Sequence, residues 1–126
     1  MKYHDFKLQG YTVEDSGTRI SLNLVYDYPN TKKEISCITF IDVTLYDFNH
    51  TSEAIITDIE DFDIFNMIKH RWKELELWNK YHKISHWDPN PEKYFANLKN
   101  NEYKGWEITS AIGFYGFVIA KNVQNT

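Results

Sequence analysis

The spacing of apolar residues changes near residue 63, and this change constrains the fold more than any other feature of the sequence. Before it, apolar and polar side chains alternate, as over residues 20–24, which is the period of a half-buried strand. Over residues 64–84 apolar side chains recur with the period of a helix, and from 106 to 123 the strand pattern returns. This order predicts an α+β fold in a single domain, residues 1–126: an antiparallel sheet of about five or six strands with one long amphipathic helix packed on a face.

Four strands are predicted before the helix, because turn-forming residues interrupt the alternation three times. The expected turns are 14–17, 29–33 and 49–52, and the expected strands are 6–13, 20–28, 35–48 and 54–62. In the third strand apolar groups lie on both faces, so its register must shift between Phe40 and Ile41, and we expect a bulge there or a central position of this strand in the sheet. Gly113 and Gly116 are expected to bend the last apolar stretch into a closing hairpin.

The helix predicted over 64–84 carries one broad apolar face. That face holds Ile64, Phe65, Met67, Ile68, Trp72, Leu75 and Trp78. Asp63 or Asp61 is expected to cap the start of the helix. On the same helical wheel, His82 falls in the middle of the buried face. A second, short helix is predicted over 91–98, with Pro91 as its first residue.

A second group of apolar residues lies opposite the main face of this helix. Leu77, Tyr81 and Ile84 form it, and a helix that is apolar all round is covered on both sides. We therefore expect residues 87–98 to fold back over them. In the alternative, they and Trp87 form an exposed aromatic patch of the kind that marks interfaces.

Charge and composition exclude several classes of protein. The 126 residues include 14 Lys and Arg against 18 Asp and Glu, a net charge of −4, which argues against nucleic acid as the main partner. No apolar run approaches the ~20 residues of a membrane span, and the start lacks the basic-then-apolar layout of a secretion signal. We therefore expect a cytoplasmic protein that does not bind membranes. The single cysteine, Cys37, excludes an internal disulfide and a multi-Cys zinc site.

The most acidic part of the chain is the stretch 51–63, which has five acidic side chains and no basic one. Within it, Asp58 and Glu60 would point to the same side of a strand. Three interpretations remain open. The sequence favours a solvated strand end with a helix cap; the others are an acidic patch that faces a partner, and catalysis by paired carboxylates.

No catalytic set emerges from the motifs. The chain lacks a nucleophile elbow, a phosphate-binding loop and a dinucleotide fingerprint. His82 and His86 have the spacing of two metal ligands on a helix, but no Glu follows His82 and the helix is expected to end between them. A partly buried histidine is the preferred interpretation. We therefore predict no enzyme, no catalytic residue, no metal and no cofactor.

Several segments, taken in sequence order, resemble small bacterial immunity-type proteins encoded beside polymorphic or contact-dependent toxins. The segments are His4-Asp5, Phe40-Ile41-Asp42-Val43, Ile59-Glu60 and the stretch from Ser110 to Ala120. The resemblance implies a cytoplasmic protein that binds a cognate toxin domain and blocks it without catalysis. Because many such toxins are basic nucleases, an acidic blocker would be steered to them electrostatically.

For this function the expected contact residues are Asp58, Glu60 and Asp61 as electrostatic anchors, with Tyr81 and Trp87 as aromatic ones. Two other functions remain open. One is a small-molecule-binding or hydrolytic α+β domain whose pocket the many aromatic residues would line. The other is a homo-oligomeric structural protein that buries the second apolar face of the helix between copies. The sequence does not determine the oligomeric state.

Overall fold

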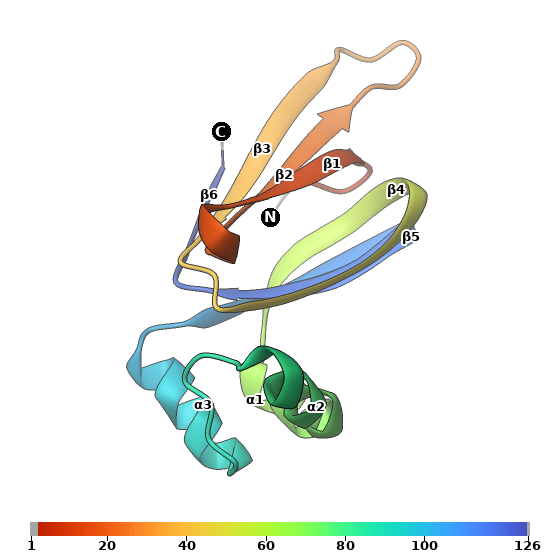
Figure 1. The fold of residues 1–126 in the computed structure, drawn as a ribbon. Helices are drawn as coiled ribbons and strands as arrows, with labels where there is room; N and C mark the ends of the chain where they lie inside the picture. Colours follow the sequence, from red (N-terminus) through yellow and green to blue (C-terminus); the bar gives the residue numbers. More distant parts are fainter. Residues whose placement is uncertain (1–2, 126) are drawn as a thin grey trace.

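The computed structural model describes residues 3–125, apart from the side chains of residues 52, 53 and 57. The chain forms an α+β fold in which an antiparallel sheet bends over on itself and helices cover one outer face (Figure 1). The bend gives the sheet an upper arm, made of β1, β2, β3 and β6, and a lower arm, made of β4 and β5. The elements in chain order are β1 (Lys7–Glu14), the short 3-10 helix η1 (Asp15–Gly17), β2 (Arg19–Tyr26), β3 (Glu34–Ile41), β4 (Leu45–Phe62), α1 (Ile64–His70), α2 (Trp72–His82), α3 (Pro91–Asn100), β5 (Lys104–Ala120) and β6 (Asn122–Asn125).

The spatial order of the strands is β5-β4-β1-β2-β3-β6, and every pairing is antiparallel. β5 and β6 lie at opposite edges of the open sheet although only Lys121 separates them in the chain. The long β4–β5 pairing is divided in two: residues 45–50 pair with 114–119, and residues 55–62 pair with 105–112. Counted by these separate segments the sheet has eight strands, which is more than the five or six predicted.

The predicted end of the third strand is wrong. β3 stops at Ile41, and the chain crosses to the lower arm through Asp42, which adopts a left-handed conformation with a φ of 57°. The expected bulge between Phe40 and Ile41 is therefore the end of the strand. The expected turn at 49–52 lies inside β4, where the pairing with β5 is irregular. Because apolar residues continue on both sides of Asp42, the hydrophobic pattern does not mark this crossing.

Two hydrophobic cores hold the layers together. The first lies between the two arms of the sheet, and its fully buried members include Ile20, Leu22, Leu24, Ile38, Phe40, Ile56, Ile59, Ile108 and Val118. The second lies between the outer face of the lower arm and the helices, and its buried members are Ile64, Ile68, Leu75, Tyr94, Leu98, Phe117 and Ile119. Since β5 contributes alternate residues to both cores, its apolar run from 117 to 120 is buried on both faces.

The long helix predicted over 64–84 is two helices, α1 and α2, separated at Arg71, whose φ and ψ are −111° and 19°. The predicted apolar face is nevertheless the one that packs on the sheet, with Ile64, Ile68 and Leu75 buried. Asp63 caps α1, because its carboxylate accepts hydrogen bonds from the N–H groups of the second and third residues that follow it. The expectation that His82 lies in the buried face is wrong, since His82 is exposed.

The fold-back segment takes a different position from the one predicted. Trp87 stacks on Trp72, with ring centroids 4.6 Å apart and planes 10° from parallel, and α3 then packs beside α1 (Figure 1). The segment therefore covers the sheet-side face of the helices. Leu77 and Tyr81 remain 53% and 67% exposed, while Ile84 is partly buried against the second core. The expected cover over Leu77 and Tyr81 is absent among the described residues.

Candidate partner-binding face

Strand alternation in β4 brings two of the predicted anchors together. Ile59 is fully buried in the first core, so Asp58 and Glu60, on either side of it, point to the opposite, outer face of the lower arm. Glu107 on β5 lies directly across from Glu60 in the pairing register. We call Asp58, Glu60, Glu107 and the neighbouring Tyr115 the acidic face.

The carboxyl groups of the acidic face repel one another. A hydrogen bond with Glu60 lowers the pKa of Asp58, and the Ile59 N–H, which donates to Asp58 Oδ1 at 2.8 Å, lowers it further. That shared hydrogen bond raises the pKa of Glu60, and the negative charges of Asp58 and Glu107 raise it more. Like charges placed directly opposite each other are unfavourable in a sheet. The three carboxyl groups of the acidic face are therefore held together at the cost of mutual repulsion.

Tyr115 supplies an aromatic ring at the edge of this face. Its hydroxyl donates to Glu107 Oε2 at 3.2 Å, and the side chain is 49% exposed. Burial of the hydroxyl and the negative charge of Glu107 raise the pKa of Tyr115. Tyr115 and Glu107 also line a hollow of about 330 Å³ between β5 and α1; its other lining residues are Phe62, Asp63, Asn66, Met67, His70, Arg71 and Phe117.

Arg71, the arginine at this hollow, is already paired. Its Nη2 lies 2.6 Å from Asp47 Oδ2 and 2.7 Å from Glu74 Oε2. The guanidinium also lies over the rings of Phe117 and Trp78, 5.0 Å and 5.2 Å from their centroids. Charge-assisted pairs and ring contacts of this kind hold a guanidinium in place. The positive charge of Arg71 is thus shared with Asp47 and Glu74.

The remaining predicted contact residues lie elsewhere. Asp61 is exposed but points to the face of β4 opposite Glu60, where it pairs with Trp106. Tyr81 is exposed near the end of α2, and Lys80 lies 5.6 Å from its ring centroid. Trp87 is partly buried between Trp72 and Tyr94. The five residues therefore do not form one continuous strand face, and their role in binding stays a prediction.

Sequence reasoning missed Glu107 and Tyr115. Neither residue stands in an acidic stretch, and both join Glu60 only through the register of β4 with β5. The turn residues that usually indicate register are absent here, because three helices separate the two strands. The strand pattern around Trp106 and Ile108 does place Glu107 on the opposite face from these apolar residues.

The described residues contain no group of three or more His, Cys, Asp or Glu side chains that could hold a metal ion. His82 and His86 do not share a helix, because α2 ends at His82 and the chain then turns through Lys83, with a φ of 52°. His86 instead hydrogen-bonds through Nε2 to the Tyr103 hydroxyl at 3.4 Å. No helix in residues 3–125 is long and apolar enough to cross a membrane.

No protein-family model matches the chain, and comparison with curated proteins and with solved structures gives no significant match.

Proposed function

We propose that this chain is a binding protein of the immunity type, which neutralises a cognate toxin domain in the cytoplasm by direct contact and without catalysis. The observation that carries the proposal is the geometry of the acidic face: Asp58 and Glu60 point to the same side of β4, and Glu107 lies directly across from Glu60 on β5. Negatively charged side chains that are held together on a strand favour a basic partner. A nuclease domain with a basic surface is the partner class that fits this chemistry.

The hollow beside the acidic face suggests how the contact would form. A Lys or Arg side chain of the partner that enters it would meet the Glu107 carboxylate and the Tyr115 ring. Arginine and tyrosine are enriched among the residues that dominate binding energy at interfaces. The carboxylates of the acidic face would then govern the rate of association, and the Tyr115 ring would provide contact area.

The test is a charge reversal with a control that changes net charge equally. Asp58→Lys with Glu60→Lys should slow association with the toxin domain encoded by a neighbouring gene, by about 10-fold or more at low salt. The variant should also weaken the salt dependence of the association rate, which stopped-flow mixing measures. The thermal midpoint should stay nearly unchanged, because Glu60 is exposed, although the half-buried Asp58 gives up the hydrogen bond from the Ile59 N–H.

Asp27→Lys with Glu34→Lys is the matched control, since both residues are exposed acids near the ends of β2 and β3. It should slow association much less, because only the general charge of the molecule changes. Equal slowing by the two double variants would contradict the acidic face as the contact. Absence of a toxin domain from the neighbouring genes would argue against the immunity function itself.

A second candidate is the homo-oligomeric structural protein, which the exposure of Leu77 and Tyr81 favours. Burial of these side chains between copies would make the oligomer sensitive to Tyr81→Ser. Sedimentation at several concentrations distinguishes the candidates: the binding protein sediments as one species at all of them, and the structural protein does not.

A further inference from the structure

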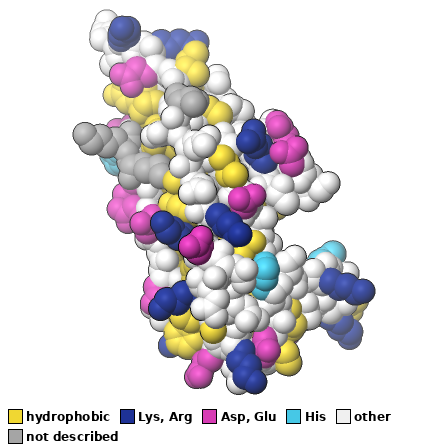
Figure 2. Space-filling model, turned by 90° about the vertical axis from the view of Figure 1, so that its left-hand side faces the viewer, with side chains coloured by type: hydrophobic (Ala, Val, Ile, Leu, Met, Phe, Trp, Pro, Cys, Tyr) yellow, Lys and Arg dark blue, Asp and Glu magenta, His cyan; other side chains and the backbone are white. Residues whose placement is uncertain are grey.

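A groove lies next to the Asp47–Arg71 ion pair: Asp47 lines it, and Arg71 lines the hollow beside the acidic face. Three segments meet there: η1 with residue 18, the crossing from β3 to β4 at residues 43–47, and the end of α2 with the loop to residue 86. The groove has a volume of about 830 Å³. Figure 2 shows the surface indented between the upper and lower parts of the molecule, with histidine at the lower side of the indentation.

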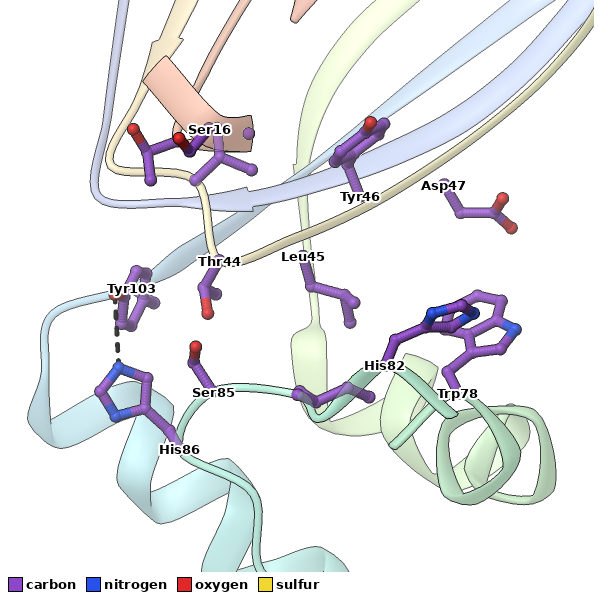
Figure 3. Close-up of a pocket in the computed structure, with 14 residues that line it drawn as sticks. Ser16, Thr44, Leu45, Tyr46, Asp47, Trp78, His82, Ser85, His86 and Tyr103 are labelled. Atoms are coloured by element: carbon purple, nitrogen blue, oxygen red, sulfur yellow. Dashed lines mark hydrogen bonds between the residues drawn. The ribbon is translucent and has the colours of Figure 1, made fainter. Parts of the chain in front are cut away.

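The polar groups that line this groove are mainly hydroxyls and imidazoles. Thr44 Oγ1 is buried and has no hydrogen-bond partner among the described residues. In Figure 3 the hydroxyls of Thr44 and Ser85 point into the same space, between His86 on one side and His82 on the other. A hydroxyl both donates and accepts a hydrogen bond, and a neutral imidazole does the same through its two nitrogens. An unpaired buried hydroxyl is unfavourable unless a bound group satisfies it.

The groove has no free permanent charge to offer a ligand. None of the described residues that line it is Lys or Arg. Asp47, the carboxylate among them, is held at 2.6 Å by Arg71. A phosphate or carboxylate ligand would find no fixed cation, and a cationic ligand would have to displace Arg71. The lining therefore suits a neutral ligand.

Aromatic rings stand at the two ends of the groove. Figure 3 shows Tyr103, hydrogen-bonded to His86, at one end and Trp78 at the other. Binding sites for small molecules combine such apolar faces with a few convergent polar groups. The backbone around the groove is also constrained, since Ser16, Lys83 and His86 all adopt left-handed conformations, with φ of 57°, 52° and 63°. Residues other than glycine that adopt left-handed conformations are concentrated at active sites and ligand-binding sites.

We infer that this groove binds a neutral saccharide of one or two rings. Sugar hydroxyls are both donors and acceptors, so they match Thr44, Ser85 and the histidines. The apolar face of the sugar ring packs against Trp78 or Tyr103. No residue of the acidic face lines this groove, so the two proposals are tested by different variants.

The test is an NMR titration of the isotope-labelled chain with N-acetylglucosamine, methyl glucoside, maltose and cellobiose at millimolar concentrations. At least one of these sugars should shift the amide signals of residues 44, 85 and 86. Thr44→Val should weaken that binding about tenfold, because a good hydrogen bond is lost. Thr12→Val, at an exposed position on β1 outside the groove, should leave it unchanged.

Ser85→Ala provides a second variant that keeps the inference falsifiable if Thr44→Val does not fold. Ser85 is exposed and lies outside the helices and strands, so its replacement should preserve the fold and weaken sugar binding severalfold. Three results would overturn the inference: no shift with any of the four sugars, shifts confined to residues outside the groove, or tighter binding of glucose 6-phosphate than of the neutral sugars. Failure of these titrations leaves the toxin-binding test unaffected.

Discussion

Among single residues, Glu60 has a titration that depends on its neighbours, and this dependence can be measured. Replacing Asp58 by Asn removes a negative charge beside Glu60, so the raised pKa of Glu60 should fall towards its ordinary value. NMR titration of the side-chain carboxyl carbons measures the change. Asp61→Asn is the control: Asp61 points to the other face of β4, and its loss should move the Glu60 pKa much less. An equal effect of the two replacements would contradict the geometry of the acidic face.

This titration also sets the pH dependence of partner binding. A basic partner binds the ionised form of Glu60, so its binding favours proton release. Affinity is therefore complete above the raised pKa of Glu60 and declines as the pH falls through it. Since Asp58 has a lowered pKa, its charge persists to lower pH, and Glu60 should control the first loss of affinity.

The cap of α1 gives a stability prediction at a single position. Asp63→Ala removes the hydrogen bonds that Asp63 Oδ1 accepts from the N–H groups of Phe65 and Asn66, at 2.9 Å and 3.4 Å. The free energy of unfolding should fall by about 1 kcal/mol. Urea denaturation measures it, with Asp61→Ala expected to change it by less than about 0.5 kcal/mol. A larger loss in Asp61→Ala would mean that the cap has been misassigned.

Part of the acidic face could be predicted from the sequence. Alternation alone places Asp58 and Glu60 on one side, because side-chain direction in a strand is a local property. Alternation does not decide between Asp61 and Asp63 as the cap of the helix. Either residue can cap, and the sequence does not determine the backbone angles that set the first helical residue. Alternation also does not find Glu107, whose position beside Glu60 depends on pairing between distant segments.

At the scale of secondary-structure elements, the approach of β5 to the start of α1 requires a glycine. A Cβ atom at Gly105 would collide with the side chains of Phe62 and Ile64. Gly105→Ala should therefore lower the free energy of unfolding by about 1–3 kcal/mol, as overpacking does. Gly10, on β1, has nothing within 4 Å of the equivalent Cβ. Thermal denaturation measures the loss, and Gly10→Ala is the matched control, which should be neutral or slightly stabilising.

The helix and strand boundaries show where the local sequence pattern predicts the structure correctly and where contacts with other elements decide it. The apolar face of α1 and α2 was predictable because period and packing agree. The break at Arg71 was not, since no Gly or Pro marks it, and Arg71 is engaged by Asp47 and Phe117 from other elements. Similarly, β3 ends at Ile41 because Asp42 adopts a left-handed conformation. Asp tolerates this conformation, but the presence of an Asp does not predict it.

For the whole molecule, the short β6 matters because it follows β5 directly in the chain and yet pairs at the opposite edge of the sheet, beside β3. It pairs with β3 from Ile38↔Asn125 to Ile41↔Asn122, and Val123 packs against the first core. Ending the chain at Lys121 should lower the free energy of unfolding by about 2 kcal/mol or more, because ladder hydrogen bonds and apolar burial are both lost. Thermal denaturation measures this loss. An unchanged midpoint would show that β6 does not stabilise the edge of the sheet at β3.

The fold class was predictable because the order of periods along the chain is itself global information. The arrangement of the layers was less predictable. A continuous apolar run such as that ending β5 indicates burial on both faces, but not which partners cover them. The division into two cores depends on the bend of the sheet between β4 and β1, which pair at Lys7↔Ile55. The apolar pattern marks neither this pairing nor the crossing of the chain from β3 to β4 through Asp42.

The two ends of the described chain meet in the upper arm, where Asn125 Nδ2 donates to the Tyr3 hydroxyl at 3.0 Å (Figure 1). Neighbouring ends of this kind make circular permutation feasible. A short linker could join them, and new ends could be opened in the exposed loop at residues 29–33 between β2 and β3. Such a rearranged polypeptide would preserve every strand while freeing the start and finish of the chain for attachment at a surface.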